Sequence, residues 1–336
     1  MRPLPNRHRY AAHAGSGESL PTQSEGDPVK IKNATVVAGL AAALALTAAA
    51  ATPAQAAKPQ PISSDTYSAL GDSYAAGFGA GPMNAYGQSA QSYPFVLAGG
   101  SGVNITAVPG ATTGSVAELQ IPIIPDTTTQ VTLTVGGNDL GFVGKAQACV
   151  MGPTACALSA EDAAKLAALR QSLAGDIASI HEMAPAATIY VTGYPLLFQA
   201  LQTPGDSGSC VIGDVTSMAG KAPLVVTEGQ ADAMDAAAVA LNGAIRSSIS
   251  GSMNRYAKYV DVTAAFAGHG LCGIPSGASQ VPNPDSFINP VHVNVIDGAP
   301  VVDVSSGPLH PTADGQLAYA ATIRANMAVS DALKIG

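Results

Sequence analysis

Short strand-like runs alternate with longer helical segments along most of the chain. Strand-like composition marks Thr66–Leu70, Val103–Val108, Gln130–Val135, Thr188–Thr192 and Tyr259–Val262, and helical periodicity covers Glu161–Met183, Thr227–Ser250 and Thr312–Lys334. Parallel strands need crossover connections, and the helices in those connections cover both faces of the sheet. The alternation therefore predicts an α/β fold with three layers, α/β/α, around a parallel central sheet.

Two long stretches, Leu196–Pro223 and Ala264–Leu309, interrupt this pattern and are predicted to be irregular. Loops of this length inside a compact domain are usually functional. We therefore expect them to shape a substrate groove and its rim.

The N-terminal 56 residues have the features of an export signal. Ala34–Ala51 contains only Ala, Leu, Val, Thr and Gly, follows Lys30 and Lys32, and precedes an Ala-x-Ala pattern at Ala54–Ala56. An uncleaved membrane anchor is the alternative, since the run approaches spanning length, but the alanine richness and the small-residue exit favour cleavage. We predict a signal peptide at 1–56, one domain at 57–336, and a secreted, extracellular protein with no stable membrane anchor after processing. The long segment before the signal suggests that translation starts at Val29.

Charge and composition argue against nucleic-acid binding. Removing residues 1–56 takes away five of the 15 basic and three of the 23 acidic side chains, which leaves a formal charge of about −10. Contacts to phosphate supply most nucleic-acid affinity, and this acidic chain has no Lys/Arg cluster. We expect a monomer with no nucleic-acid partner.

All four cysteines lie in the exported part, where an even number favours disulfides. Three pairings are possible. We favour Cys149 with Cys156, which closes a small loop, and Cys210 with Cys272, which lie in the two long irregular stretches. The spacing does not fit a C-x-x-C zinc site, and we expect no metal or organic cofactor.

Four short motifs carry candidate chemistry. Ser73 follows a strand-like run in G-D-S, Gly110 lies in V-P-G-A-T-T, Asn138 in G-G-N-D and His310 in L-H-P-T-A-D-G. Taken singly, each residue suits a turn, a cap or the surface. Residues at the carboxyl ends of parallel strands, however, meet at one edge of the sheet, where open α/β folds bind ligands.

In this order, the four motifs resemble the SGNH (GDSL) esterase/lipase family, secreted actinobacterial members included. The resemblance covers the chain from about Tyr67 to the last helix and implies the SGNH hydrolase fold, a flavodoxin-like parallel sheet in a single three-layer domain. It also implies that Ser73 is the nucleophile and His310 the general base. The backbone N–H groups of Ser73 and Gly110 and the side chain of Asn138 would form the oxyanion hole.

One position departs from the family pattern. The family commonly has an aspartate three residues before the histidine, where this chain has Gly307, and neither Asp303 nor Asp314 has the expected spacing. Some secreted members use a backbone carbonyl instead, so a carbonyl from Ser306 to Pro308 is expected to orient His310. Asp72 and Asp139 are expected to cap turns or to bond nearby backbone.

In the predicted mature chain, the competitors for the role of base are His181, His269 and His292, and His269 is interpreted as structural. The glycine-rich segment Gly77–Gly81 lacks the P-loop signature and an acidic residue at Rossmann spacing, which argues against a nucleotide site.

The resemblance therefore implies a serine ester hydrolase, a lipase or esterase and possibly a phospholipase A, that acts on a small-molecule or lipid ester. The alternatives are a carbohydrate acetylesterase and a non-catalytic extracellular binding protein on the same fold. The acetylesterase would need aromatic residues to stack on sugars, but Trp is absent and aromatic residues make up only 5% of the chain. The apolar segments Leu196–Leu201 and Ile121–Pro125 suit either an acyl groove or the core.

Overall fold

The computed structural model describes residues 66–100, 104–152, 156–199, 209–272 and 282–335. The predicted signal peptide at 1–56, its boundary with 57–336 and the suggested start at Val29 lie outside the described residues. Within the described residues, no helix is both long enough and apolar enough to cross a membrane.

Five parallel strands form the central sheet, in the order β2-β1-β3-β4-β7. They are β1 (Tyr67–Gly71), β2 (Asn104–Ile105), β3 (Gln130–Thr134), β4 (Thr188–Thr192) and β7 (Ala257–Val260). Every residue of β1 and β4 is buried, as expected for a parallel sheet covered on both faces. The predicted parallel sheet is confirmed, although β2 is much shorter than the run expected at Val103–Val108 and β7 begins two residues before Tyr259.

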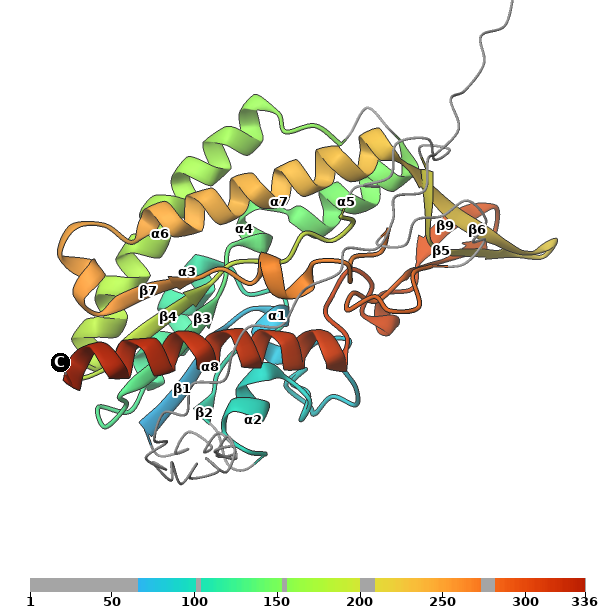
Figure 1. Cartoon of the computed structure of the whole chain (residues 1–336). Helices are drawn as coiled ribbons and strands as arrows, with labels where there is room; N and C mark the ends of the chain where they lie inside the picture. Colours follow the sequence, from blue (N-terminus) through green and yellow to red (C-terminus); the bar gives the residue numbers. More distant parts are fainter. Residues whose placement is uncertain (1–65, 101–103, 153–155, 200–208, 273–281, 336) are drawn as a thin grey trace, which may run out of the picture. The chain divides into compact units, whose positions relative to one another are not determined.

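Long helices cover the two faces of this sheet. Figure 1 shows α6 (Ala160–Met183) and α7 (Glu228–Ser248) on one side and α8 (Ala313–Ile335), which packs against α2 (Tyr93–Leu97), on the other. Both α6 and α7 begin at a capping box, in which the side chain of Ser159 or Thr227 accepts a hydrogen bond from the third residue of the helix. The three-layer α/β/α prediction is confirmed.

Short helices and turns connect these layers. They are α1 (Ser73–Ala76), α3 (Thr113–Ser115), α4 (Gly137–Leu140), α5 (Phe142–Met151), the π-helical turn η2 (Val116–Gln120), and the 3₁₀ turns η3 (Ile121–Ile123), η5 (Gly251–Arg255), η6 (Thr263–Phe266) and η7 (Val304–Ser306).

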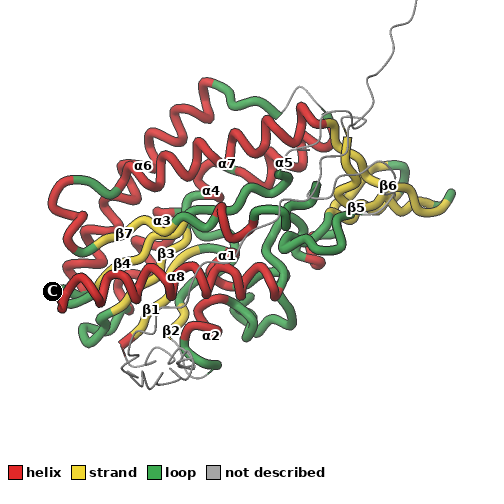
Figure 2. The backbone as a smooth tube through the Cα atoms, viewed as in Figure 1, coloured by secondary structure: helices red, strands yellow, loops and turns green. Residues whose placement is uncertain are grey.

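A second, four-stranded sheet corrects the prediction for the two irregular stretches. Its order is β6-β5-β8-β9, with β5 (Ser209–Ser217), β6 (Gly220–Thr227), β8 (Val291–Ile296) and β9 (Ala299–Val302). The β5–β6 and β8–β9 pairs are antiparallel hairpins, whereas β5 and β8 run parallel. Figure 2 shows β5 and β6 side by side in yellow. The two stretches form one sheet because β5 comes from the first and β8 from the second.

Two disulfides brace this region. Cys149 at the end of α5 is bonded to Cys156, and Cys210 of β5 is bonded to Cys272, which follows η6. These are the two pairings favoured from the sequence. The second one links the two stretches that build the second sheet.

The core lies between the central sheet and its helices. Leu70, Leu133 and Ile177 are fully buried there. Leu197 and Phe198 are buried as well, so the described part of Leu196–Leu201 packs into the core. In Ile121–Pro125, Ile121 and Ile124 are buried, whereas Ile123 is 60% exposed. Leu201 lies outside the described residues.

Candidate active site

Ser73 is the first residue of α1, directly beyond the carboxyl end of β1. The chain turns sharply here because Asp72 caps the helix, and its Oδ1 accepts from the backbone N–H of Tyr74 at 2.9 Å. The buried side chain of Gln120 holds the preceding glycine through both of its backbone groups: its Oε1 accepts from Gly71 N at 2.7 Å and its Nε2 donates to Gly71 O at 2.9 Å. The position of the Ser73 hydroxyl is therefore set by the end of a buried strand.

His310 faces Ser73 from the loop that precedes α8. Its Nε2 lies 2.8 Å from Ser73 Oγ, and its Nδ1 lies 2.9 Å from the carbonyl oxygen of Pro308. A carbonyl can only accept, so the proton of a neutral imidazole must lie on Nδ1. Nε2 is then left unprotonated and accepts from the hydroxyl. The arrangement is a serine–histidine dyad whose tautomer is set by a backbone oxygen.

The backbone around His310 is held by contacts from two other segments. Tyr74 donates its hydroxyl to Leu309 O at 2.6 Å, and Leu309 has a φ of +64°, uncommon for a residue with a side chain. Asn289 pairs with Leu309 and His310 through its backbone, and its Nδ2 also donates to Gly79 O at 3.0 Å. These bonds stabilise a strained turn that aims the imidazole at Ser73.

Gly307 occupies the position where an aspartate would be expected, and the packing explains why. It has a φ of +68°, and a Cβ placed there would collide with the backbone of Gly79. A side chain at residue 307 would therefore need both a left-handed conformation and a displaced neighbouring loop. The loop has the room for a carbonyl beside His310 and lacks the room for a carboxylate on residue 307.

Gly110 and Asn138 follow the two strands that flank β1. Val108 N–H donates to Gly71 O at 3.1 Å, and Asn138 Nδ2 donates to Ala111 O at 2.9 Å. Gly110 lies between these two tied residues, has a φ of +84°, and a Cβ there would meet nothing within 4 Å. Its backbone thus faces open space at the edge of the sheet that carries Ser73.

Hydrogen-bond donors remain available at this edge. Ser73 is the first helical residue of α1, so its N–H has no acceptor within the helix. Only one of the two N–H groups of the Asn138 amide is needed for the bond to Ala111. The neighbouring Asp139 carboxylate accepts from both the backbone and the hydroxyl of Thr113, which fixes the two flanking segments together. The four residues of the sequence motifs therefore converge on one sheet edge.

Residues 69–318 match the model of the GDSL-like lipase/acylhydrolase family, and this segment is more than half of the chain. The chain belongs to this family. The family resemblance of the four motifs is thereby confirmed, and the chain is a carboxylic ester hydrolase of the lipase/esterase kind.

Individual relatives agree with this assignment. A lipase from Streptomyces rimosus is 33% identical over 267 residues, covering 76% of this chain and 84% of that protein. Lipase 2 from Streptomyces coelicolor is 31% identical, with coverage of 73% and 85%. Among solved structures, phospholipase A1 from Streptomyces albidoflavus is similar with a TM-score of 0.56 and 26% identity, over 78% of this chain and 99% of that chain. The extracellular lipase from Streptomyces rimosus gives a TM-score of 0.55 and 28% identity, over 77% and 98%.

Burial tunes the ionisable groups of this GDSL-family site. It lowers the pKa of His310, and the hydrogen bond to the Pro308 carbonyl opposes that shift only partly. Beside the nucleophile, burial raises the pKa of Asp72 to about 7, although the Tyr194 hydroxyl and the Tyr74 N–H both donate to its carboxylate. The lowered pKa of His310 favours the neutral imidazole, which can act as a base. The raised pKa of Asp72 favours its protonated carboxyl.

The other histidines are engaged elsewhere. His181 stacks on Tyr256, and His269 stacks on Phe287 with its Nδ1 2.7 Å from Asp285 O. His292 Nδ1 lies 2.6 Å from Asp214 Oδ2 in the second sheet.

The candidate carboxylates also lie apart from the dyad. Asp303 accepts from the backbone and hydroxyl of Ser305, and Asp314 is exposed in the first turn of α8. Asp72 caps α1, as expected, and Asp139 bonds the backbone of Thr113, which is distant along the chain.

Sequence reasoning missed the residues that position the site from a distance. Gln120, Asn289 and Gln316 each bond backbone groups that are 21 to 242 residues away along the chain. Polar residues with such partners leave no periodic signal. In contrast, the Asp297–Gly298 turn between two strands of the second sheet is a recognisable hairpin signal.

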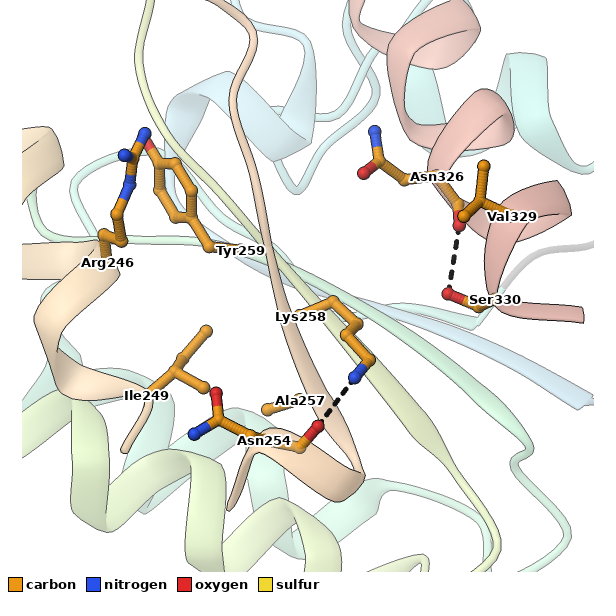
Figure 3. Close-up of a pocket in the computed structure, with 9 residues that line it drawn as sticks. All are labelled: Arg246, Ile249, Asn254, Ala257, Lys258, Tyr259, Asn326, Val329 and Ser330. Atoms are coloured by element: carbon orange, nitrogen blue, oxygen red, sulfur yellow. Dashed lines mark hydrogen bonds between the residues drawn. The ribbon is translucent and has the colours of Figure 1, made fainter. Parts of the chain in front are cut away.

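A pocket of about 360 Å³ lies beside the edge strand β7 and is separate from the dyad. In Figure 3 the guanidinium of Arg246 lies over the Tyr259 ring, and Lys258 donates to the backbone oxygen of Asn254 at 2.6 Å. Ser330 donates to Asn326 O. Arg246 also donates to Asp261, and the Asn254 and Asn326 amides donate to backbone oxygens outside the lining, so most polar groups of this pocket already have partners. Across the described residues there is also no group of three or more His, Cys, Asp or Glu side chains suited to a metal ion.

Proposed function

We propose that the protein hydrolyses carboxylic esters through an acyl-enzyme on Ser73, with His310 as the general base. The observation that supports this most is the contact of 2.8 Å between His310 Nε2 and Ser73 Oγ, in a ring whose other nitrogen is held by the Pro308 carbonyl. A nucleophile, its base and the group that orients the base are all within hydrogen-bond distance.

In the first half-reaction, Ser73 Oγ attacks the ester carbonyl carbon while Nε2 of His310 takes the hydroxyl proton. The negative charge moves onto the carbonyl oxygen, and the N–H groups of Ser73, Gly110 and the Asn138 amide donate to it. When the intermediate collapses, the C–O bond to the alcohol breaks and His310 returns the proton to the leaving alcohol.

In the second half-reaction, a water molecule replaces the alcohol. His310 takes one proton from the water as its oxygen attacks the acyl carbon, and then gives that proton to Ser73 Oγ as the bond to the serine breaks. The products are the carboxylic acid and free enzyme. The Pro308 carbonyl holds Nδ1–H throughout; being neutral, it stabilises the imidazolium less than a carboxylate would.

We further propose a lipid or simple carboxylic ester as the substrate. The named activities of the Streptomyces relatives, lipase and phospholipase A1, support this choice. We also propose a secreted monomer with a signal peptide at 1–56 and one hydrolase domain at 57–336, because the chain carries an apolar run with an Ala-x-Ala exit and the related Streptomyces rimosus lipase is extracellular.

The test is hydrolysis of p-nitrophenyl esters from acetyl to palmitoyl by the purified mature protein, beside Ser73→Ala, under non-reducing conditions. Turnover that depends on Ser73 and rises with acyl length is expected. Turnover confined to the acetyl ester would contradict the lipid substrate and indicate an acetylesterase. Folded protein without turnover on any ester would indicate a binding protein.

A further inference from the structure

An uncharged groove of about 420 Å³ lies between α5 and the second sheet. The α5 wall presents Gly144, Gln147 and Ala148, and the opposite wall presents Val293, Val302 and Val304. Gln147 is the polar side chain in this set. Residues of α5 and of β9 line the groove together, although the two elements are separated by more than 140 residues along the chain.

Along the chain, the α5 wall is connected to the oxyanion edge and the opposite wall to the dyad. The α5 wall follows α4, which carries Asn138, and Gly144 is six residues beyond that asparagine. The opposite wall ends in η7, and Val304 is six residues before His310. Six residues span at most about 20 Å when extended and about 9 Å when helical. Each wall of the groove therefore lies within about 20 Å of the dyad or the oxyanion edge, a distance that a long acyl chain on the ester carbonyl can span.

The chemistry of the walls restricts the occupant. The lining has no charged side chain to pair with a phosphate, and its single amide is a poor match for the many hydroxyls of a sugar. Val304 is 62% exposed, so an apolar occupant would remove apolar surface from water. A saturated hydrocarbon chain suits these walls.

We propose that this groove binds the distal part of a long acyl chain while the ester carbonyl lies against Ser73. This inference rests on the proposed function. Each methylene that leaves water should favour the longer substrate by about fourfold. Residues of α5 and of the second sheet, none of which belongs to the dyad or the oxyanion hole, would then select the length of the acyl chain.

The decisive variant is Gly144→Phe, which fills the groove from the α5 wall. A Cβ at residue 144 meets nothing within 4 Å, so the ring can enter the groove without displacing the fold. We expect the ratio of kcat/KM for p-nitrophenyl decanoate to that for p-nitrophenyl acetate to fall at least about tenfold, the effect of losing two or more methylene contacts. Both esters are used below their aggregation limits.

Gly243→Phe is the matched control. Gly243 is also exposed, also lies in a helix (α7) and also has open space at its Cβ, but it does not line the groove. Its decanoate-to-acetate ratio should equal that of the wild type. Val304→Ser, at an exposed position, removes apolar surface without filling the groove and should lower the ratio in the same direction even if Gly144→Phe folds poorly.

The outcomes separate the two claims. Acetate turnover that depends on Ser73, with an unchanged ratio in both groove variants, would overturn the groove and leave the proposed function intact. Loss of Ser73 dependence, or no turnover of either ester by the folded wild type, would overturn both. A reduced ratio in Gly144→Phe and Val304→Ser, but not in Gly243→Phe, supports the groove.

Discussion

The central sheet and the second sheet differ in how their sequences encode structure and in what they contribute to the site. The central sheet has five parallel strands, and the neighbours β1, β2 and β3 bring Ser73, Gly110 and Asn138 to one edge. The second sheet contains two antiparallel hairpins and contributes a wall of the uncharged groove. The comparison teaches that Ser73, Gly110 and Asn138 depend on the buried sheet for their positions, whereas the proposed selection of acyl length is assigned to a more exposed sheet.

His310 is the residue at which the two regions meet, since the chain passes from β9 through η7 to the dyad. We predict that His310→Ala lowers kcat by about 10⁴- to 10⁶-fold, because the proton of Ser73 then has no acceptor. Steady-state kinetics on p-nitrophenyl acetate checks this. A loss below about tenfold would show that another group acts as the base.

The disulfide between Cys210 and Cys272 attaches β5 of the second sheet to the segment after η6, and neither cysteine lies in the central sheet. Replacing both cysteines with alanine opens a cross-link over 62 residues, and we predict a loss of about 4 kcal/mol in the free energy of unfolding on a chain-entropy account. Hydrogen exchange should show deprotection of β5 and β8 before β1 and β3. Equal deprotection in both sheets would mean that they unfold as one unit.

Replacing Asn138 tests the oxyanion hole at the edge of the central sheet and leaves Ser73 unchanged. We predict that Asn138→Ala lowers kcat by about 10²- to 10³-fold with little change in KM, since an oxyanion donor acts mainly in the transition state. The acyl-length preference should stay as in the wild type. A shift in that preference would contradict the separation between the two sheets.

The pKa shifts of Asp72, which follows β1 of the central sheet, and Asp214, which lies in β5 of the second sheet, predict opposite pH dependences of stability. The pKa of Asp72 is raised to about 7 by burial, so its contribution to stability is full below its ordinary pKa of 3.8 and is lost as the pH rises towards 7. Burial also raises the pKa of Asp214, but bonds from Lys221 and His292 outweigh that effect and lower it. The contribution of Asp214 is therefore present above its ordinary pKa and is lost on acidification.

We accordingly predict that Asp72→Asn has a smaller fall in Tm between pH 5 and pH 8 than the wild type, by an amount corresponding to a few kcal/mol or less. Asp176, whose pKa burial also raises to about 7, is unchanged in both proteins, so the comparison isolates Asp72. Parallel Tm curves for the two proteins would contradict the raised pKa.

The smallest effect is expected at Asp303, whose carboxylate bonds Ser305 in η7. Asp303→Asn should change kcat less than about threefold, because the Pro308 carbonyl already orients His310. A loss near 10⁴-fold, as when a triad aspartate is replaced, would make Asp303 the orienting group.

Much of the central region could be predicted because its signals are local. β3 and β4 are short runs rich in β-branched residues, and Ser73, Gly110 and Asn138 lie two to five residues beyond the ends of β1, β2 and β3. The carbonyl that orients His310 belongs to Pro308, which lies within the predicted range from Ser306 to Pro308.

The second sheet escaped prediction because the strand pairing that joins its two hairpins is not local. Strand β5 pairs with β8, about 80 residues later, and β5 itself is interrupted at Gly213, where its register with β6 shifts. The alternating run Val291–Ile296 and the Asp297–Gly298 turn were readable. The bonds from Gln120 and Asn289 were not, since a buried amide acquires its partner only when distant segments pack together.

The most direct test of the account is to trap the acyl-enzyme. The mature protein is mixed with p-nitrophenyl decanoate, quenched in acid within the first turnover and digested for mass spectrometry. The account predicts a decanoyl adduct on the peptide that contains Ser73, formed with a burst of p-nitrophenol equal to the enzyme concentration and absent from Ser73→Ala. Turnover that continues in Ser73→Ala, or an adduct on another residue that forms and decays at the turnover rate, would contradict it.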